Sequence, residues 1–224
     1  MTRFALVGAV DFNEKVFRAE HYDVLLAVDA GYATLKSQGL APDLVIGDFD
    51  SLGYVPEAEN ILRFPHEKDE SDMELAIAHA CKAGADEIVL YGCLSRRLDH
   101  TLANIQVMRS CAQSGVHIFG VGCGFVLTLL SGPCRIAWEA FDPATLDAGE
   151  YGRYLSVFAL GGPAQGVTER GLLYSLENAV LPDTASLGLS NEFTGAPAEV
   201  SVQQGDVVVI FSEDAWPAVC LPQS

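Results

Sequence analysis

Short apolar runs alternate with amphipathic segments through the first half of the chain. Strands are expected at residues 4–10, 24–28, 44–46, 61–64, 88–91 and 116–121, and helices at 12–18 (helix or loop), 32–38, 71–82 and 101–112. The third helix has clear start signals, because Ser71 and Glu74 form a capping-box pattern and the apolar residues behind them recur on one helical face. Steady alternation of strands and helices predicts a parallel sheet wrapped by helices.

The pattern changes after about residue 123. Short strands are expected at 125–130, 134–138, 154–160, 198–202 and 207–211, separated by turns rich in glycine and proline, and no segment has a helical period. This pattern is typical of a small all-β sandwich or partial barrel. We therefore expect an α/β fold in two domains, a parallel-sheet α/β domain at residues 1–122 and a smaller all-β domain at 123–224.

Composition and charge exclude several classes of partner. Half of the residues are hydrophobic, which indicates a folded globular protein, and the formal net charge of -17 argues against binding to nucleic acid or to anionic membranes. A metal–nucleotide complex or a cationic small molecule fits this charge, although excess acid is also a solubility device. The six cysteines are scattered, so we expect buried thiols in a reducing compartment. Residues 1–10 do not resemble a signal peptide, and glycines interrupt the charge-free stretch at 111–134, so a cytoplasmic, soluble protein is expected.

Two carboxylates follow the apolar strand at 44–46. Gly47 ends this strand, and Asp48 and Asp50 come next at alternate positions. At the carboxyl end of a parallel strand, alternate residues of an irregular turn can both face the ligand crevice. Mg²⁺ prefers one or two such carboxylates together with phosphate oxygens, so the pair is a candidate magnesium site, and a solvated acidic turn is the alternative.

Further acidic and basic residues occur at predicted strand ends and helix starts. The acids are Asp29, Asp69, Asp72 and Asp99, and the cations beside them are Lys68, Arg96 and Arg97. Because the ends of parallel strands gather along one edge, these groups can converge on a polyphosphate. Each has a structural alternative: a first-turn acid such as Asp72 suits the helix dipole, Lys68 and Arg96 can pair with nearby acids, and a lone His100 can be structural. A Walker loop, a GxGxxG fingerprint and a nucleophile elbow are all missing from the sequence, which favours phosphate chemistry through a metal.

Six motifs in order resemble those of the thiamine pyrophosphokinase family. They are residues 29–33, 42–51, 68–72, 97–105, 171–176 and 188–193, and they cover both halves of the chain. The resemblance implies transfer of the diphosphoryl group of ATP to the hydroxyl of thiamine, giving thiamine diphosphate and AMP. It also implies that residues 1–122 form the ATP- and magnesium-binding catalytic domain, that 123–224 form the thiamine-binding and dimerisation domain, and that the protein is a homodimer.

By matching positions, the resemblance assigns a role to each motif residue. Metal binding falls to Asp48, Asp50 and Asp72; nucleotide binding to Asp29, Lys68, Ser71, Arg97 and His100; catalysis to Asp72, Asp99 and Arg97; and thiamine binding to Tyr174, Ser190 and Asn191. Asp72 and Asp99 are both candidates for a general base. Tyr174 is expected to stack on a thiamine ring, and a place in the core of a β-strand is the alternative.

The chain departs from the family pattern at two places, and two other functions are alternatives. Ala30 replaces the second glycine of an Asp-Gly-Gly motif, and Ser95-Arg96 stand where two glycines usually precede the arginine. Both changes are expected to reduce the space in which the backbone can approach ATP closely. A metal-dependent phosphohydrolase would use the same acids to activate water. A non-catalytic sensor of thiamine or nucleotide would keep binding without turnover.

Overall fold

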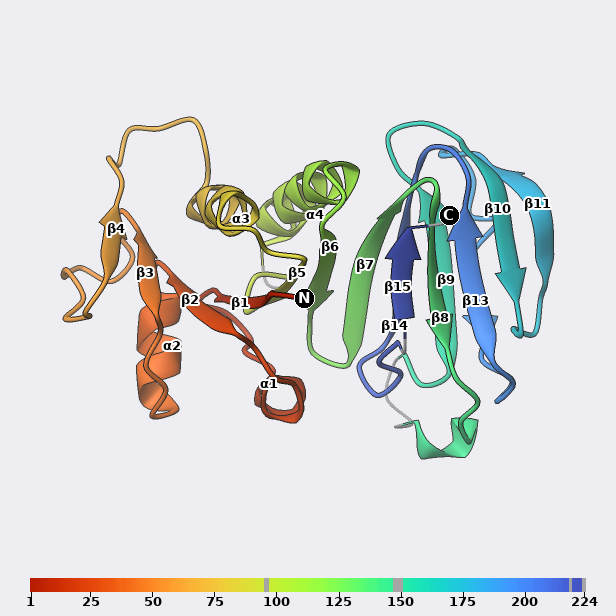
Figure 1. Cartoon of the computed structure of the whole chain (residues 1–224), viewed down its shortest axis with the longest axis horizontal. Coiled ribbons are helices and arrows are strands. Elements are labelled where there is room, and N and C mark those ends of the chain that lie inside the picture. Colours follow the sequence, from red (N-terminus) through yellow and green to blue (C-terminus); the bar gives the residue numbers. More distant parts are fainter. Residues whose placement is uncertain (95–96, 147–150, 218, 223–224) are drawn as a thin grey trace. The chain divides into compact units, whose positions relative to one another are not determined.

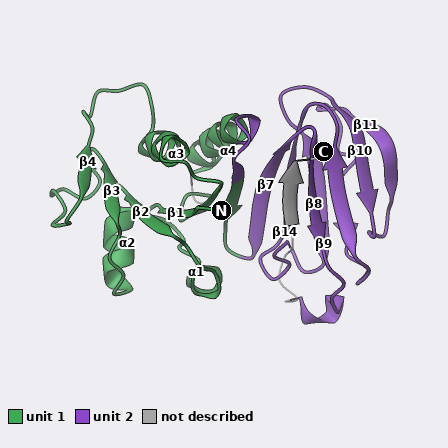
Figure 2. Cartoon of the chain, viewed as in Figure 1, with its two compact units in different colours: residues 1–111, 118–123 green, residues 112–117, 124–224 purple. Residues whose placement is uncertain are grey.

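The computed structural model describes residues 1–94, 97–146, 151–217 and 219–222, and Ser95 and Arg96 lie outside them. The chain divides into two compact units (Figure 2). The first unit comprises residues 1–111 and 118–123, and the second comprises 112–117 and 124–224. Each unit is described by itself below.

The first unit is built on a sheet of strands that are mostly apolar and buried, except the edge strand β4, which is largely exposed. They are β1 (Arg3–Val7), β2 (Val24–Val28), β3 (Leu44–Gly47), β4 (Ile61–Arg63), β5 (Glu87–Tyr91) and β6 (His117–Val121). Their order is β6-β5-β1-β2-β3-β4, and β1 pairs in parallel with both β2 and β5. The pairs β2–β3 and β3–β4 are parallel as well. Strands β2 to β4 follow β1 on one side, and β5 and β6 lie on its other side, so the strand order reverses between β1 and β5. In open α/β sheets, ligands bind at such a switch point.

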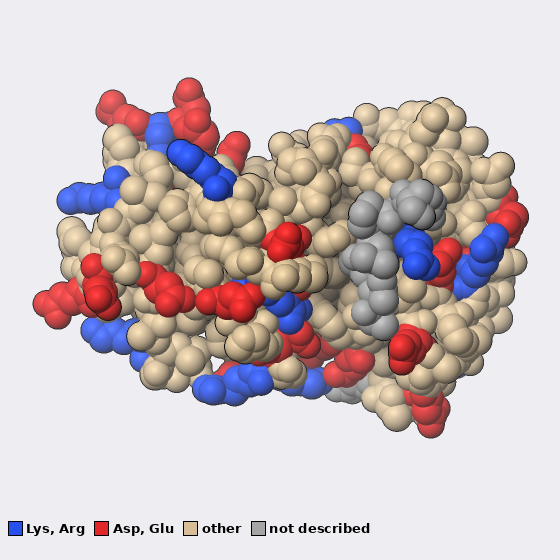
Figure 3. All heavy atoms as spheres, viewed as in Figure 1, with Lys and Arg blue, Asp and Glu red and all other residues tan. Residues whose placement is uncertain are grey.

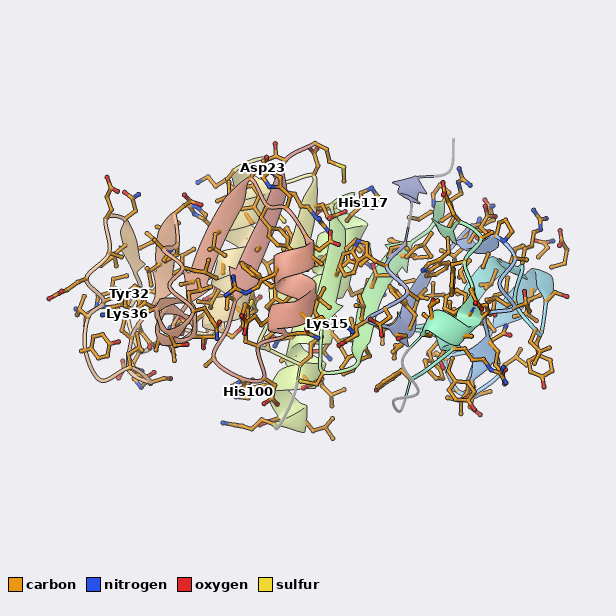
Figure 4. The ribbon with its side chains drawn as sticks, turned by 90° about the horizontal axis from the view of Figure 1, so that it is seen from below. Lys15, Asp23, Tyr32, Lys36, His100 and His117 are labelled. Atoms are coloured by element: carbon orange, nitrogen blue, oxygen red, sulfur yellow. The ribbon has the colours of Figure 1, made fainter. Side chains whose placement is uncertain are left out.

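Helices cover both faces of this sheet. They are α1 (Glu14–Ala19), α2 (Gly31–Ser37), α3 (Asp72–Lys82) and α4 (Leu98–Gln113). Figure 1 shows α1 and α2 on one face and α3 and α4 on the other. The predicted cap of α3 is present, because the Ser71 hydroxyl accepts a hydrogen bond from the Glu74 N–H at 3.1 Å. Along α2, the Lys36 ammonium lies 5.8 Å from the centre of the ring of the buried Tyr32 (Figure 4).

The second unit consists of two antiparallel sheets. Its strands are β7 (Phe125–Ser131), β8 (Cys134–Trp138), β9 (Tyr154–Ala159), β10 (Ala164–Arg170), β11 (Leu176–Leu181), β12 (Asn191–Glu192), β13 (Ala198–Val202), β14 (Asp206–Ser212) and β15 (Val219–Pro222). In the first layer, four strands are neighbours in the order β12-β9-β14-β7, and the second layer is a five-stranded sheet with the order β11-β10-β13-β8-β15. Trp138 of the second sheet packs edge-on against Phe211 of the first, with ring centres 5.3 Å apart. The two sheets thus form a sandwich around an aromatic core.

Four strands of this unit were missing from the sequence-based prediction. β10 has a bulge at Gln165–Val167, where Gly166 adopts φ 66°, so its residues do not alternate cleanly between polar and apolar. β11 is an edge strand that pairs only with β10 among the described strands, and half of its residues are exposed. β12 and β15 are too short for a periodic signal, at two and four residues.

Surface features partly match the sequence-based expectations. The prediction that the cysteines are buried is wrong for Cys123, which is exposed, whereas Cys93, Cys111 and Cys134 are buried. Over the described residues, no helix combines the length and the apolar character needed to cross a membrane. Acidic and basic side chains are interspersed on the face seen in Figure 3.

Candidate active site

A cavity of about 810 Å³ lies at the carboxyl edge of the parallel sheet. The segments that follow β1, β2, β3 and β5 line it, together with the first turns of α3 and α4. All of these residues belong to the first unit. The cavity therefore occupies the place where the chain order reverses, which is where the sequence led us to expect converging carboxylates.

Asp29 reaches this cavity through a strained turn after β2. It adopts φ 47°, and its backbone N–H donates to the carbonyl of Ile46 at 2.8 Å. A Cβ at Gly47 would lie 3.1 Å from the Cα of Asp29, so glycine at this position makes room for the turn. The Oδ1 atom of Asp29 is buried and has no hydrogen-bond partner among the described residues. A buried carboxylate oxygen in this state is suited to a cation.

The turn after β3 directs Asp48 and Asp50 to the same side. Phe49 between them has φ 67° and is 3% exposed, so its ring is in the core while the two carboxylates face the cavity. His66 lies against both, with its Nδ1 3.4 Å from Asp48 Oδ2 and 3.3 Å from Asp50 Oδ2. These three residues form one group whose ligand atoms lie within 4.8 Å of one another.

Asp48 also belongs to a second carboxylate group. Ligand atoms of Asp29, Asp48 and Asp72 lie within 4.8 Å of one another. Lys68 bridges two of them, with its Nζ 2.8 Å from Asp48 Oδ2 and 3.1 Å from Asp72 Oδ1. The expected trio of Asp48, Asp50 and Asp72 is thus distributed over two adjoining groups that share Asp48.

The charges in this cluster shift one another's pKa. The hydrogen bond from Lys68 lowers the pKa of Asp48 to about 2. Burial raises the pKa of Asp72, and the ion pair with Lys68 offsets part of that rise. Burial lowers the pKa of Lys68, but its hydrogen bonds to Asp48 and Asp72 outweigh this effect and the net shift is upward. Lys68 is therefore a charged partner of the acids. This agrees with the structural alternative given above, in which Lys68 pairs with nearby acids.

Arg97 and Asp99 form a pair on the cavity wall at the start of α4. The guanidinium of Arg97 donates from Nη2 to Asp99 Oδ2 at 2.6 Å and from Nε to Oδ1 at 3.2 Å. The backbone N–H of His100 donates to the same Oδ1 at 3.0 Å, and Figure 4 shows His100 at this end of the helix. The Arg97 hydrogen bonds lower the pKa of Asp99 to about 2. Both side chains are exposed, so this pair is free to meet a ligand.

Ser71 and Ala30 also line the cavity. The Ser71 hydroxyl caps α3, so its oxygen already has one partner. Ala30 has φ -64° and ψ -7°, a helical conformation that alanine adopts without strain, whereas a Cβ at the neighbouring Gly31 would lie 1.8 Å from the Val7 carbonyl oxygen. The glycine that this turn requires is therefore the one at 31, which the chain retains.

The three residues assigned to thiamine lie in the second unit. Tyr174 is 66% exposed and sits between β10 and β11, which contradicts the alternative of a core position within a strand. Ser190 is exposed with φ 57°, and its N–H donates to the Ser156 hydroxyl at 3.0 Å. Asn191 is buried, and its Oδ1 accepts a hydrogen bond from the Tyr174 N–H at 2.9 Å. The structure therefore brings Tyr174 and Asn191 together.

Sequence analysis missed three residues at these two sites. His66 contacts the acidic pair, but a single histidine among loop residues has no spacing signal. Asn104 is buried, lines the cavity and donates to the Cys93 carbonyl at 2.8 Å, and its place within a motif was the available signal. Glu169 is buried beside Asn191, which no pattern in β10 indicates.

Comparison with known proteins gives two family matches. Residues 18–120 match the family model described as "Thiamin pyrophosphokinase, catalytic domain". Residues 144–207 match "Thiamin pyrophosphokinase, vitamin B1 binding domain". The first range contains every cavity carboxylate discussed above, and the second contains Tyr174, Ser190 and Asn191.

Individual relatives agree with these matches. The chain is 28% identical over 203 residues to "Thiamine pyrophosphokinase" of Bacillus subtilis (strain 168), covering 87% of this chain and 90% of that protein. A solved thiamin pyrophosphokinase structure from Geobacillus thermodenitrificans has a TM-score of 0.77 and 25% identity, covering 98% of this chain and 100% of the other. The solved structure of the Candida albicans thiamin pyrophosphokinase has a TM-score of 0.76 at 14% identity, covering 94% and 88%, which is a likeness of fold.

Proposed function

Since the chain belongs to the thiamin pyrophosphokinase family, we propose that it transfers the diphosphoryl group of ATP to the hydroxyl of thiamine, giving thiamine diphosphate and AMP. The grouping of the Asp29, Asp48 and Asp72 carboxylates within 4.8 Å in one cavity carries this proposal at the level of residues. Residues 1–122 would act as the catalytic domain and 123–224 as the thiamine-binding domain.

A divalent ion fits this carboxylate group. Mg²⁺ takes oxygen ligands and is usually held by one or two carboxylates together with substrate phosphates. Asp48 and Asp72 would hold it with Asp50 beside them, and the buried Oδ1 of Asp29 provides a further oxygen without a hydrogen-bond partner among the described residues. The ion would neutralise charge on the phosphates as it develops. The four aspartates would act by holding this ion beside the phosphates.

The cations of the site would bind the triphosphate. Lys68 forms ion pairs with both Asp48 and Asp72, so its positive charge lies within the acidic group. This charge would offset the repulsion between these acids and the phosphates. Arg97 has a planar guanidinium on the cavity wall, which suits two phosphate oxygens. Ser71 and His100 line the same cavity and would add hydrogen bonds to the nucleotide.

The reaction is an in-line displacement at the β-phosphorus. The thiamine hydroxyl oxygen forms a bond to this phosphorus, the bond from the β-phosphorus to the oxygen that bridges to the α-phosphorus breaks, and AMP leaves. Both carboxylate oxygens of Asp99 already accept hydrogen bonds from Arg97 or the His100 N–H, so we assign Asp99 to orienting Arg97. Asp72 is then the carboxylate to which we assign the hydroxyl proton.

The second unit would bind the vitamin. Tyr174 has an exposed ring that can stack on the aromatic rings of thiamine, including the cationic thiazolium, and Ser190 has an exposed hydroxyl for a polar edge. Asn191 is buried, so we assign it to shaping the site through the backbone of Tyr174. A homodimer and a cytoplasmic location remain part of this proposal through the family resemblance.

An assay of AMP release tests the proposal. The chain is incubated with ATP and Mg²⁺, with and without thiamine, and AMP and thiamine diphosphate are quantified by chromatography. We expect both products in equal amounts, and only when thiamine is present. AMP release at the same rate without thiamine would identify a phosphohydrolase, and thiamine binding without AMP formation would identify a sensor.

A further inference from the structure

Glu169 on β10 is a buried carboxyl outside the candidate active site. The residue is only 1% exposed. One oxygen, Oε2, accepts a hydrogen bond from the Asn191 Nδ2 at 2.7 Å, whereas Oε1 is buried and has no hydrogen-bond partner among the residues that the structure describes. Burying a carboxyl in this way is costly, so its presence in a core position requires an explanation.

The partner of Glu169 is an amide whose every polar atom is in use. Asn191 Oδ1 accepts from the N–H groups of Tyr174 and Glu192, each at 2.9 Å. Asn191 Nδ2 donates to Glu169 and also to the Tyr174 carbonyl, at 2.6 Å. Because Oε2 of Glu169 accepts from the NH₂ end of the amide, this hydrogen bond favours the orientation in which the amide is found.

The amide in turn holds Tyr174 by both backbone groups. Its N–H and C=O are each bound to Asn191, and the next contact along the chain, from the Leu173 N–H to the Glu192 carbonyl at 2.9 Å, ties the same segment to β12. The Tyr174 ring itself is 66% exposed. The backbone of this residue is therefore fixed while its ring stays available for a ligand.

We propose that Glu169 is a positioning residue for thiamine, which acts through Asn191 to hold the backbone of Tyr174 so that its ring meets the vitamin. The inference rests on the proposed function, because it takes thiamine as the ligand of Tyr174. A leucine would fill a similar volume in the sandwich without an unpartnered oxygen, but it would leave the Asn191 NH₂ group with one acceptor fewer. The hydrogen bond from Asn191 to this carboxyl, which helps to hold the backbone of Tyr174, thus accounts for a buried glutamate at this position.

Substitutions at Glu169 test this role, with Glu177→Gln as the matched control. Glu177 is an exposed glutamate on the neighbouring strand β11, paired with Arg170 at 2.7 Å. We expect Glu169→Leu to raise the thiamine Kd, measured by calorimetry, and the KM for thiamine by about tenfold. The KM for ATP should stay within about twofold, because the nucleotide residues lie in the other unit. Glu169→Gln keeps one acceptor oxygen and should give an intermediate rise of about threefold, and Glu177→Gln should change nothing.

A double substitution separates positioning from general loss of structure. In a Tyr174→Ala background the ring is gone, so Glu169→Leu should add no further loss of thiamine affinity. Unchanged thiamine affinity in Glu169→Leu, or an equal loss in both backgrounds, would overturn the inference. If Glu169→Leu does not fold, Glu169→Gln decides, and wild-type thiamine affinity in that variant would overturn the inference as well. A wild-type chain that binds thiamine but forms no AMP would refute the proposed function and leave the calorimetric test intact.

Discussion

The Nζ of Lys68 lies 2.8 Å from the Oδ2 of Asp48, although the two residues belong to separate segments of the chain. Asp48 follows β3, and Lys68 comes from the loop that leads into α3. The side chain of Lys68 is 12% exposed and that of Asp48 is 9% exposed, so this ion pair is well shielded from solvent. It ties the acidic turn to the start of α3, where Asp72 joins the same ammonium at 3.1 Å.

Removing the charge of Asp48 should abolish most turnover. Asp48 is shared by both carboxylate groups, so Asp48→Asn weakens the proposed hold on the metal. We expect a loss of about 10²–10³ in kcat, or ~3–4 kcal/mol of transition-state stabilisation, with an unchanged circular-dichroism spectrum. Glu59→Gln, an exposed change on the loop before β4, is the control and should keep full activity. Normal turnover by Asp48→Asn would show that the metal assignment is wrong.

Lys68→Met should destabilise the folded chain in a pH-dependent way. Lys68 lowers the folded-state pKa of Asp48 to about 2, below the value of about 3.9 for an unfolded aspartate. This contribution to the unfolding free energy is present above about pH 4 and is lost as the pH falls toward 2. We expect Lys68→Met to cost about 1–3 kcal/mol at pH 7 in urea unfolding, and the difference from wild type should shrink at pH 3. An equal difference at both pH values would contradict the ion-pair account.

The α/β half was largely predictable because most of its strands are buried and apolar and because α3 has a clear cap. The strand at Val24–Val28 was predicted with its observed bounds, and the Ser71 cap was predicted from its residue types. The convergence of Asp29, Asp48 and Asp72 follows from the rule that parallel strands end at one edge. Which acids share a group depends on turn geometry, above all on the left-handed conformation of Phe49, which its residue type does not signal.

The β half was less predictable because its informative features depend on contacts between distant residues. Glu169 and Asn191 are 22 positions apart and meet only when β10 and β12 are in place. Bulges and edge exposure also hide the strand period in β10 and β11. The exposed position of Tyr174 could not be distinguished from a core position by its residue type.

Ala30→Gly should bring no gain in nucleotide affinity. Ala30 has helical backbone angles, so glycine is not required there and would add backbone freedom at the start of α2. Ala30 is the N-cap residue of α2, where glycine is tolerated at least as well as alanine, so we expect the unfolding free energy to change by less than about 0.5 kcal/mol and the KM for ATP to stay within about twofold. Thermal unfolding and steady-state kinetics check the two parts. A large fall in the KM for ATP would mean that the alanine methyl group obstructs the nucleotide.

Glu169→Gln should change how stability depends on pH. Burial raises the folded-state pKa of Glu169 above that of an unfolded glutamate, and the hydrogen bond from Asn191 offsets part of that rise. A raised pKa contributes stability that is fully present below the unfolded pKa, about 4.3, and is lost as the pH rises through the folded pKa. Glutamine does not ionise, so the stability of the variant relative to wild type should increase between pH 4 and pH 7 in urea unfolding. A constant difference would show that this carboxyl does not titrate abnormally.

The reaction itself is tested most directly by ³¹P NMR of a single incubation of the wild-type chain with ATP, Mg²⁺ and thiamine. Attack on the β-phosphorus predicts that the signals of ATP give way to those of AMP and thiamine diphosphate in equal amounts, with no ADP. Thiamine monophosphate with ADP, or AMP with free diphosphate, would contradict diphosphoryl transfer to thiamine by this chain.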